Sequence, residues 1–366
     1  LWVMTATASP SPTPAPSPLP TPSPSTAVVR TATASDVRAG WHSSYVLNAY
    51  GSVYALGYRG YGQMGDGVHS AQSYDTLTRV PVLNNIAKIQ QSKGLESYAT
   101  CVVAISDDGN LYYWPGLAMS NAGVSTSTDY TVYGPLTGFS STVADASVNG
   151  VSYNHFVCAL LDSGAVECVG YNGNGQLGDG TKTSQATPVA VVGLPTTTTT
   201  QVAAAGSSAC ASNATQVWCW GLNSNGQLGD GTKTEQLSAT SVVGSGNFDG
   251  DVIDVQCGGV HCRMMLDNGD MSCWGDNAYG QIGDGSKTDQ TSPVTVSALS
   301  GSVVLIDLGW FRTCALTSSG DMYCWVRGVL GWLATCILHV AFARTVIFSP
   351  VTCRFRPLLP PLGHQH

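Results

Sequence analysis

The chain has 366 residues, of which 10% are charged, 42 are Gly and 18 are Pro, and its formal net charge is −8. This composition, with abundant Ser, Thr and Val, favours short strands joined by tight turns over helices. The net negative charge disfavours the binding of nucleic acid by a basic surface. Because no cluster of Lys and Arg occurs in the repeats, we expect no nucleic-acid partner.

Residues 1–30 are rich in Pro, Ser and Thr and contain few bulky apolar side chains, as in Ser9-Pro10-Ser11-Pro12. Such a segment cannot bury a hydrophobic core, so we expect a disordered, extended linker. Its Ser and Thr content leaves two interpretations open, an unmodified spacer or an O-glycosylated stalk.

One unit recurs six times between residues 31 and 325. Each copy predicts a strand, a three-residue turn, a second strand, a Gly-rich loop and a strand that contains Pro and Val. In the third copy these parts are 155–161, 162–164, 165–170, 171–183 and 188–192. Five of the turns place a Gly where a left-handed residue is needed, at Gly51, Gly109, Gly164, Gly269 and Gly320.

Each unit is therefore expected to form a small antiparallel sheet. A single sheet of this size has two exposed faces and two open edges, so it is not stable alone. Repeats of this length form stacked or circular arrays. Radial packing covers the faces of like sheets, and we therefore predict an all-β propeller.

The most regular copies read Cys219-Trp220-Gly221-Leu222-Asn223 and Cys273-Trp274-Gly275-Asp276-Asn277, each followed by a Gly-Gln-x-Gly-Asp-Gly loop. Loops of this kind contain residues 63–67, 176–180, 227–231 and 281–285. The pattern resembles the repeat of the regulator of chromosome condensation (RCC1) family. This resemblance implies a seven-bladed propeller that binds other proteins, in some members as a guanine nucleotide exchange factor. The second unit departs from the pattern after Trp114, where no such loop follows.

The sixth unit breaks off after Trp325, so we expect the last blade to be incomplete. Residues 326–366 lack acidic side chains and the Gly-Asp loops. We expect a hydrophobic and basic tail outside the propeller, either aberrant in origin or disordered. Its apolar part, 328–343, is a weaker candidate for a membrane helix, because it is shorter than the roughly twenty residues that span a bilayer. An unfinished ring leaves strand edges open, which predicts poor solubility.

Twelve cysteines are many for a reducing compartment. Four pairs flank the hairpin turns, where folding would set the partners opposite one another at disulfide distance. The predicted disulfides are Cys158–Cys168, Cys210–Cys219, Cys262–Cys273 and Cys314–Cys324. Two alternatives stay open: the cysteines are small buried hydrophobes, or Cys257 is the partner of Cys262. Zinc is not expected, because no Cys-x-x-Cys occurs and each blade would offer two thiolates.

Two sets of recurring residues are interpreted as structural. A catalytic site needs one constellation rather than a copy in each blade, so the equivalent histidines are expected to make structural hydrogen bonds. These are His42, His155 and His261. The tryptophans that follow the second cysteines are expected to pack between adjacent blades. These are Trp220, Trp274 and Trp325.

The loop Asp residues suggest calcium, but an Asp-Gly pair is also ordinary turn chemistry, and no Asp-x-Asp-x-Asp run supplies the oxygens that calcium needs. These residues are Asp66, Asp179, Asp230 and Asp284. Gly173-x-Gly175-x-x-Gly178 matches the dinucleotide-binding fingerprint by letter, yet no helical pattern follows it. We therefore predict no metal, no cofactor and no catalytic residue.

Two kinds of surface feature remain. Asn213-Ala214-Thr215 is a glycosylation acceptor motif at a predicted hairpin tip. Aromatic residues on the loops are candidates for contacts with a protein partner, with packing between blades as the alternative. They are Tyr58, Tyr61, Tyr171 and Tyr279.

These observations predict a non-enzymatic, protein-binding propeller that is secreted or displayed at the cell surface. The cysteine pairs and the glycosylation motif favour this location. The alternative is an intracellular exchange factor for a small GTPase, in the cytoplasm or the nucleus, which the family resemblance allows.

Overall fold

The computed structural model describes residues 34–326, together with 334–336 and 353–355. Within the first range, the positions not described are 40–42, 61, 69–72, 82, 94–100, 115–132, 152–153, 196–198, 297–298, 300–302 and 320–321. The predicted linker and nearly all of the predicted tail therefore lie outside the described residues. Within the described part, the regular elements are β-strands, and no helix has the length and apolar character of a membrane span.

Strands β1 to β23 build six antiparallel sheets, which we call blades 1 to 6. Blade 1 contains β1 (Ala34–Ala39), β2 (Ser43–Asn48), β3 (Val53–Tyr58) and β4 (Ser73–Arg79). Blade 2 contains β5 (Ile86–Gln91), β6 (Val102–Ser106), β7 (Leu111–Trp114) and β8 (Tyr133–Leu136). Blade 3 contains β9 (Val143–Val151), β10 (Asn154–Leu161), β11 (Val166–Gly170) and β12 (Gln185–Ala190).

The remaining blades follow the same order. Blade 4 contains β13 (Gln201–Ala204), β14 (Ser208–Ser212), β15 (Val217–Gly221) and β16 (Gln236–Ser241). Blade 5 contains β17 (Val252–Cys257), β18 (His261–Leu266), β19 (Met271–Gly275) and β20 (Gln290–Thr295). Blade 6 has three described strands, β21 (Val303–Leu308), β22 (Arg312–Thr317) and β23 (Met322–Val326). A separate ribbon pairs β24 (Ala334–Cys336) with β25 (Cys353–Phe355).

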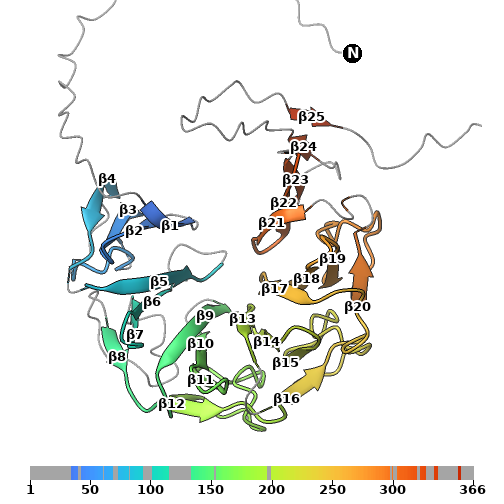
Figure 1. The fold of residues 1–366 in the computed structure, drawn as a ribbon, viewed down its shortest axis with the longest axis horizontal. Helices are drawn as coiled ribbons and strands as arrows, with labels where there is room; N and C mark the ends of the chain where they lie inside the picture. The colour runs from blue at the N-terminus through green and yellow to red at the C-terminus, as the bar shows by residue number, and fades with distance from the viewer. Residues whose placement is uncertain are drawn as a thin grey trace, which may run out of the picture.

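The blades stand around one central opening, with the first strand of each blade innermost and the fourth at the rim (Figure 1). This confirms the predicted all-β propeller of six units. The sequence pattern predicts three strands in each unit, and the structure adds the innermost strand before each hairpin. Along the described residues the ring is open between blades 1 and 6 (Figure 1).

The predicted turns fold as their glycines require. Between β10 and β11, the Gly164 amide donates to the Leu161 carbonyl at 2.8 Å, and the Leu161 amide donates to the Ala165 carbonyl at 2.9 Å. Gly164 has φ +81°, a conformation that costs a residue with a Cβ atom free energy. The turn between β18 and β19 repeats these bonds, so both hairpins share one loop length.

Apolar side chains on both faces of each sheet form the core between neighbouring blades. The cluster between blades 4 and 5, for example, includes Leu228, Val255, Met264 and Trp274, all buried. Four similar clusters join the other adjacent pairs of blades. Each blade is therefore stabilised by its neighbours, as expected for sheets that cannot bury their faces alone.

The opening of the ring exposes one face of blade 1. The fourth residue of the innermost strand is buried in blade 2 as Ile89, in blade 5 as Val255 and in blade 6 as Ile306. In blade 1 the same place holds Val37, which is 57% exposed. The difference arises because no described sheet packs in front of blade 1.

Candidate protein-recognition surface

The Gly-Gln loops connect adjacent blades through hydrogen bonds to tryptophan. The carbonyl of Gln227 in blade 4 accepts a hydrogen bond of 3.0 Å from Nε1 of Trp274 in blade 5. The equivalent pairs, both at 2.9 Å, are Trp114 with Gln63 and Trp220 with Gln176. Because all three indole rings are fully buried, the predicted packing of Trp220 and Trp274 between blades is confirmed.

A buried Asn that the sequence analysis missed organises each regular loop. In blade 4, Nδ2 of Asn223 donates to Oδ1 of Asp230 at 3.0 Å and to the Thr232 carbonyl at 3.2 Å. Its Oδ1 accepts from the Leu228 amide at 3.0 Å. Asn172 and Asn277 occupy the equivalent positions. The recurrence of Gly-x-Asn shortly before the Gly-Gln loop was the available signal.

The loop carboxylates are engaged by their own loops. Oδ1 of Asp179 accepts from the Thr181 amide at 2.9 Å, and Asp284 accepts from the Ser286 amide at 2.8 Å. In blade 1, where Arg59 replaces the organising Asn, the guanidinium lies 2.7 Å from Asp66. These contacts are the local turn chemistry that the sequence favoured over calcium binding.

Two of the recurring histidines, His155 and His261, are buried at the start of the second strand of a blade. Nε2 of His261 lies 2.9 Å from Oγ1 of Thr313 in the next blade, and that hydroxyl donates to the Gln281 carbonyl at 3.0 Å. His155 is also fully buried, and His42 lies outside the described residues. Burial, followed by the nearby charge of Lys93, lowers the pKa of His261 to about 3. The contacts of His261 support a structural role.

We expect acid to destabilise the protein through His261. Its pKa is depressed on folding, so the unfolded chain binds more protons between pH 6.5 and about 3, and stability is lost as the pH falls through that range. The expected loss is about 1.4 kcal/mol per pH unit. Urea unfolding at pH 7 and pH 5 measures it, with His261→Gln as the control. An equal pH dependence in both proteins would contradict the assignment.

The structure brings three of the four predicted cysteine pairs together across their hairpins. Cα atoms of the two partners lie 4.0 to 4.1 Å apart, and each pair is joined by a disulfide. These pairs are Cys158–Cys168, Cys210–Cys219 and Cys314–Cys324. In each case the shared hairpin register places the two residues directly opposite one another.

The predicted pair Cys262–Cys273 is wrong. Register places Cys273 opposite Arg263, while Cys262 lies opposite Trp274 on one side and opposite Cys257 on the other. A shift of one residue along a strand turns a side chain to the other face of the sheet. Cys262 therefore faces blade 4 and is bonded to Cys257, the alternative partner noted from the sequence. Cys273 is a buried free thiol whose pKa burial raises to about 12.

Mass spectrometry of the oxidised protein, measured intact and after digestion, tests this pairing. We expect linked peptides for Cys257–Cys262 and none for Cys262–Cys273. Cys273 should resist alkylation until the protein unfolds, because a buried, protonated thiol is a poor nucleophile. A Cys262–Cys273 link in the folded protein would contradict the register of blade 5.

The predicted aromatic contact residues are only partly accessible. Tyr279 is exposed and packs edge-on against Phe311 with ring centroids 5.2 Å apart. Tyr58 and Tyr171 are half-buried, and Tyr61 lies outside the described residues. Asn213 sits at the predicted hairpin tip, where its Oδ1 accepts from the Gln216 amide at 2.8 Å.

The innermost strands instead supply a mixed apolar and charged surface. In β5, β17 and β21 the first, fourth and sixth residues are buried, and the others are exposed or half-buried. Because these strands are innermost, their accessible side chains line the central opening. The most exposed apolar ones are Ile253 at 46%, Val304 at 50% and Leu305 at 62%.

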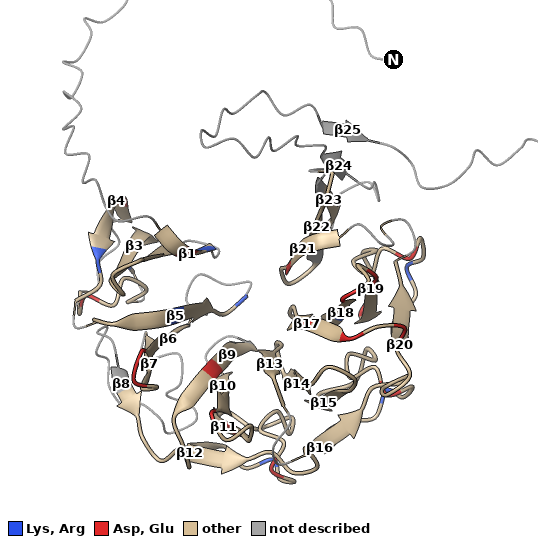
Figure 2. Cartoon of the chain, viewed as in Figure 1, with Lys and Arg blue, Asp and Glu red and all other residues tan. Residues whose placement is uncertain are grey.

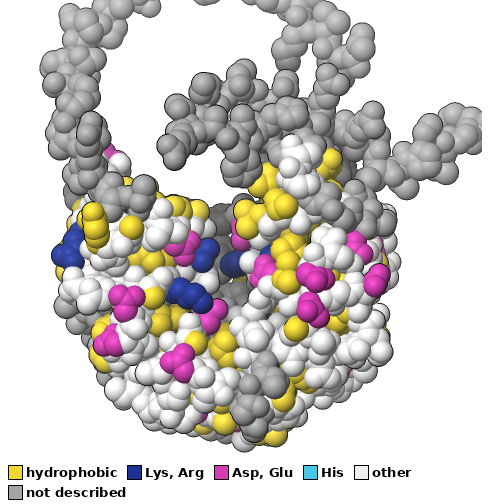
Figure 3. Space-filling view, in the orientation of Figure 1, with side chains coloured by type: hydrophobic (Ala, Val, Ile, Leu, Met, Phe, Trp, Pro, Cys, Tyr) yellow, Lys and Arg dark blue, Asp and Glu magenta, His cyan; other side chains and the backbone are white. Residues whose placement is uncertain are grey.

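Ion pairs surround the same opening. Nζ of Lys93, just after β5, lies 3.2 Å from Oδ1 of Asp307 on β21 and 3.4 Å from Oε1 of Gln256 on β17. Lys88 pairs with Asp145 of the next blade at 3.3 Å. Figure 2 shows the charges on the inner strands, and Figure 3 shows both signs gathered around the central hollow. Partial burial lowers the pKa of Lys93, which the carboxylate of Asp307 opposes.

The guanidinium of Arg263 is fully buried and binds residues of the innermost strands of blades 5 and 6. Nη2 of Arg263 on β18 donates to Oδ2 of Asp254 at 2.6 Å and to the Ile306 carbonyl at 3.0 Å. Arg263 is 0% exposed, whereas Asp254 remains partly accessible on β17. The pair therefore joins the inner strands of blades 5 and 6. We call the side chains of Lys88, Lys93, Ile253, Asp254, Val304, Leu305 and Asp307 the inner-strand surface.

Comparisons with known proteins agree with this architecture. Residues 163–212, 216–264 and 268–316 match the family model of the regulator of chromosome condensation (RCC1) repeat, and 252–281 match a second RCC1 repeat model. The mouse E3 ubiquitin-protein ligase HERC2 is 29% identical over 76% of this chain. The Ultraviolet-B receptor UVR8 of Arabidopsis thaliana is 28% identical over 74% of this chain.

The chain spans only part of these relatives, 6% of the length of HERC2 and 59% of UVR8. Among solved structures, human WBSCR16 superposes with a TM-score of 0.65 at 18% identity, covering 82% of this chain and 78% of its own. Yeast RCC1 (Prp20), solved bound to Kap60, gives 0.64 at 14% identity, covering 79% of this chain and 69% of its own. The repeated loops, the blade arrangement and the repeat matches show that residues 163–316 contain RCC1 repeats within a β-propeller.

Proposed function

We propose that the propeller is a non-enzymatic protein-binding module that acts outside the cell or at its surface, with the inner-strand surface as its docking site. The observation that carries the proposal is the exposure of Val304 and Leu305 beside the Lys93–Asp307 ion pair. Protein interfaces combine apolar contacts with a charged rim that orients the partner. The packed interfaces between neighbouring blades hold both in fixed positions.

The innermost strands suit a docking role because polar contacts connect them across three blades. Lys93 of blade 2 reaches Gln256 of blade 5 and Asp307 of blade 6, so three blades meet at one point of the surface. A preorganised surface loses little conformational entropy when a partner binds. The partner that fits is a protein with apolar side chains flanked by charges of both signs.

The location outside the cell is supported by the cysteines and by Asn213. Four disulfides join described residues, and such bonds persist in oxidising compartments. The acceptor motif at Asn213 lies at a hairpin tip whose next residues, Ala214 and Thr215, are exposed. Treatment of protein from a secreting cell line with a glycosidase should lower its mass, and Asn213→Gln should abolish that change. A mass unaffected by the glycosidase would count against this location.

Binding to a panel of soluble cell-surface ectodomains tests the docking site. We expect at least one ectodomain to bind the wild-type chain, and Leu305→Glu to weaken that binding at least tenfold by placing a charge in the contact. Leu77→Glu is the matched control, because Leu77 is similarly exposed at 49% but lies on the outermost strand β4. Equal binding by both variants would place the contact elsewhere.

The alternative function, nucleotide exchange, has its own measurement. Release of a fluorescent guanine nucleotide from a panel of small GTPases should be unchanged by this chain. Acceleration of release from one GTPase, lost in Leu305→Glu, would favour the exchange factor over the extracellular module while retaining the same surface.

A further inference from the structure

Four cysteines meet at the interface between blades 4 and 5. Cys210 and Cys219 come from the hairpin of blade 4, and Cys257 and Cys262 come from the first two strands of blade 5. All four lie in one buried cluster, with at most 3% of any of them exposed. We call these four side chains the sulfur cluster.

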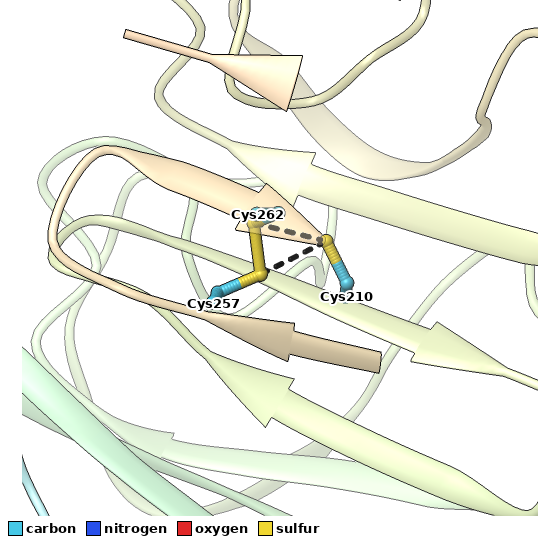
Figure 4. Close-up of side chains that lie close together, drawn as sticks. All are labelled: Cys210, Cys257 and Cys262. Atoms are coloured by element: carbon cyan, nitrogen blue, oxygen red, sulfur yellow. Dashed lines mark hydrogen bonds between the residues drawn. A yellow bond between two sulfur atoms is a disulfide. The ribbon is translucent and has the colours of Figure 1, made fainter. Parts of the chain in front are cut away.

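The sulfurs of the two blades are in contact. Sγ of Cys210 lies 3.6 Å from Sγ of Cys257 and 3.9 Å from Sγ of Cys262. Figure 4 shows Cys210 facing the Cys257–Cys262 disulfide. These three sulfurs form the one group of potential metal-ligating side chains found along the described residues, and Cys219 is bonded to Cys210. Each of the two blades supplies only two of these cysteines, and the interface between the blades brings all four together.

We propose that the sulfur cluster, when its cysteines are reduced, binds one zinc ion that joins blades 4 and 5. Zinc in structural sites takes four ligands in a tetrahedron, and four cysteine thiolates are one of its common ligand sets. With sulfurs about 2.3 Å from the metal, the edges of that tetrahedron measure about 3.8 Å. The distances of 3.6 and 3.9 Å from Cys210 to the sulfurs of blade 5 already have this length.

The complete burial of the cluster fits a closed, structural site that is filled as the chain folds. Binding converts four thiols into four coordinated thiolates and releases four protons to the solvent, with no change in oxidation state. A chain folded under reducing conditions therefore needs no further redox step. The zinc site is independent of the proposed docking function, because it shares no residue with the inner-strand surface. In an oxidising compartment the same sulfurs form two disulfides instead.

The preceding interface provides a matched comparison within the same fold. There Cys158 and Cys168 of blade 3 and Ala204 and Ala209 of blade 4 belong to one buried cluster between blades 3 and 4. Ala204 and Ala209 are paired across β13 and β14 as Cys257 and Cys262 are across β17 and β18. The alanine pair shows that the fold accepts Ala at these two places.

Zinc titration of the full chain, purified and kept under a phosphine reductant, tests the site. We expect one equivalent of zinc to be retained against a chromogenic chelator, with protection of four thiols from alkylation. The double variant Cys257→Ala and Cys262→Ala should lose this zinc, and its folding is checked by circular dichroism. The double variant Cys158→Ala and Cys168→Ala should keep it.

Cobalt provides a second measurement that does not depend on stability. One equivalent of Co²⁺ should give the intense thiolate-to-cobalt charge-transfer bands of a tetrahedral sulfur site in the wild-type chain and not in Cys257→Ala with Cys262→Ala. The proposal would be overturned if the reduced wild-type chain retained no zinc. It would also be overturned if the blade 5 and blade 3 double variants retained zinc equally.

Discussion

Asp254→Ala should destabilise the protein by about 3–5 kcal/mol, because it leaves a buried guanidinium without its counter-ion. Arg263 is completely buried, and its Nη2 atom donates to Oδ2 of Asp254 at 2.6 Å. Its Nε and Nη1 atoms have no hydrogen-bond partner among the described residues. The acceptor that remains, the Ile306 carbonyl at 3.0 Å from Nη2, carries no net charge to balance the guanidinium. Urea unfolding at pH 7 measures the loss.

Two controls separate this effect from a general response to lost charge. Asp307→Ala removes the carboxylate of the Lys93 ion pair, which is 71% exposed, so it should cost less than about 1 kcal/mol. Adding Arg263→Cys to Asp254→Ala removes the buried charge and places a second cysteine opposite Cys273. This double variant should recover most of the lost stability and form a disulfide between residues 263 and 273. A cost for Asp254→Ala no larger than that for Asp307→Ala would contradict the account.

Trp274→Ala should cost about 3–5 kcal/mol by opening a cavity between blades 4 and 5. The indole is fully buried, packs closely over Gly229, and donates to the Gln227 carbonyl at 3.0 Å. Thermal or urea unfolding measures the loss. Hydrogen exchange in β15 and β19 should quicken first, because these strands border the cavity.

Trp274→Phe and Tyr279→Ala are the matched variants. The Phe variant retains an aromatic ring but loses the bond to Gln227, so it should fall between wild type and Trp274→Ala. Tyr279→Ala truncates an exposed ring on the adjacent loop and should change stability by less than about 1 kcal/mol, because it opens no cavity. Equal losses for Trp274→Ala and Tyr279→Ala would show that the indole does not join the blades.

Local sequence signals account for the hairpins and the repeat, but they stop short of the inner-strand surface. The Asp-Ser-Gly turn and the alternation around it suffice to predict β10 and β11, because both depend on neighbours along the chain. The contact of Lys93 with Asp307 joins residues 214 positions apart. Such a contact depends on how the blades close around the axis, which no local pattern encodes.

The cysteines show the same limit at the scale of one residue. Cys158 and Cys168 pair as predicted because their positions are symmetrical about the turn. In blade 5 the turn has the same length, but Arg263 occupies the position that would oppose Cys273. The spacing between Cys262 and Cys273 is one residue longer than that between Cys158 and Cys168. That extra residue places Cys262 on the opposite face of its sheet. The sulfur cluster follows from this reversal.

Zero-length cross-linking with a carbodiimide, followed by peptide mass spectrometry, tests the ring most directly, because it joins only a Lys and a carboxylate already in contact. We expect amide links between adjacent blades at Lys182–Glu235 and Lys233–Asp289, which are paired at 2.7 and 2.8 Å. A link between Lys93 and Asp307, paired at 3.2 Å, should also form across the central opening. Sheets laid out in a row would give the first two links without the third, and that result would contradict the propeller and its docking surface.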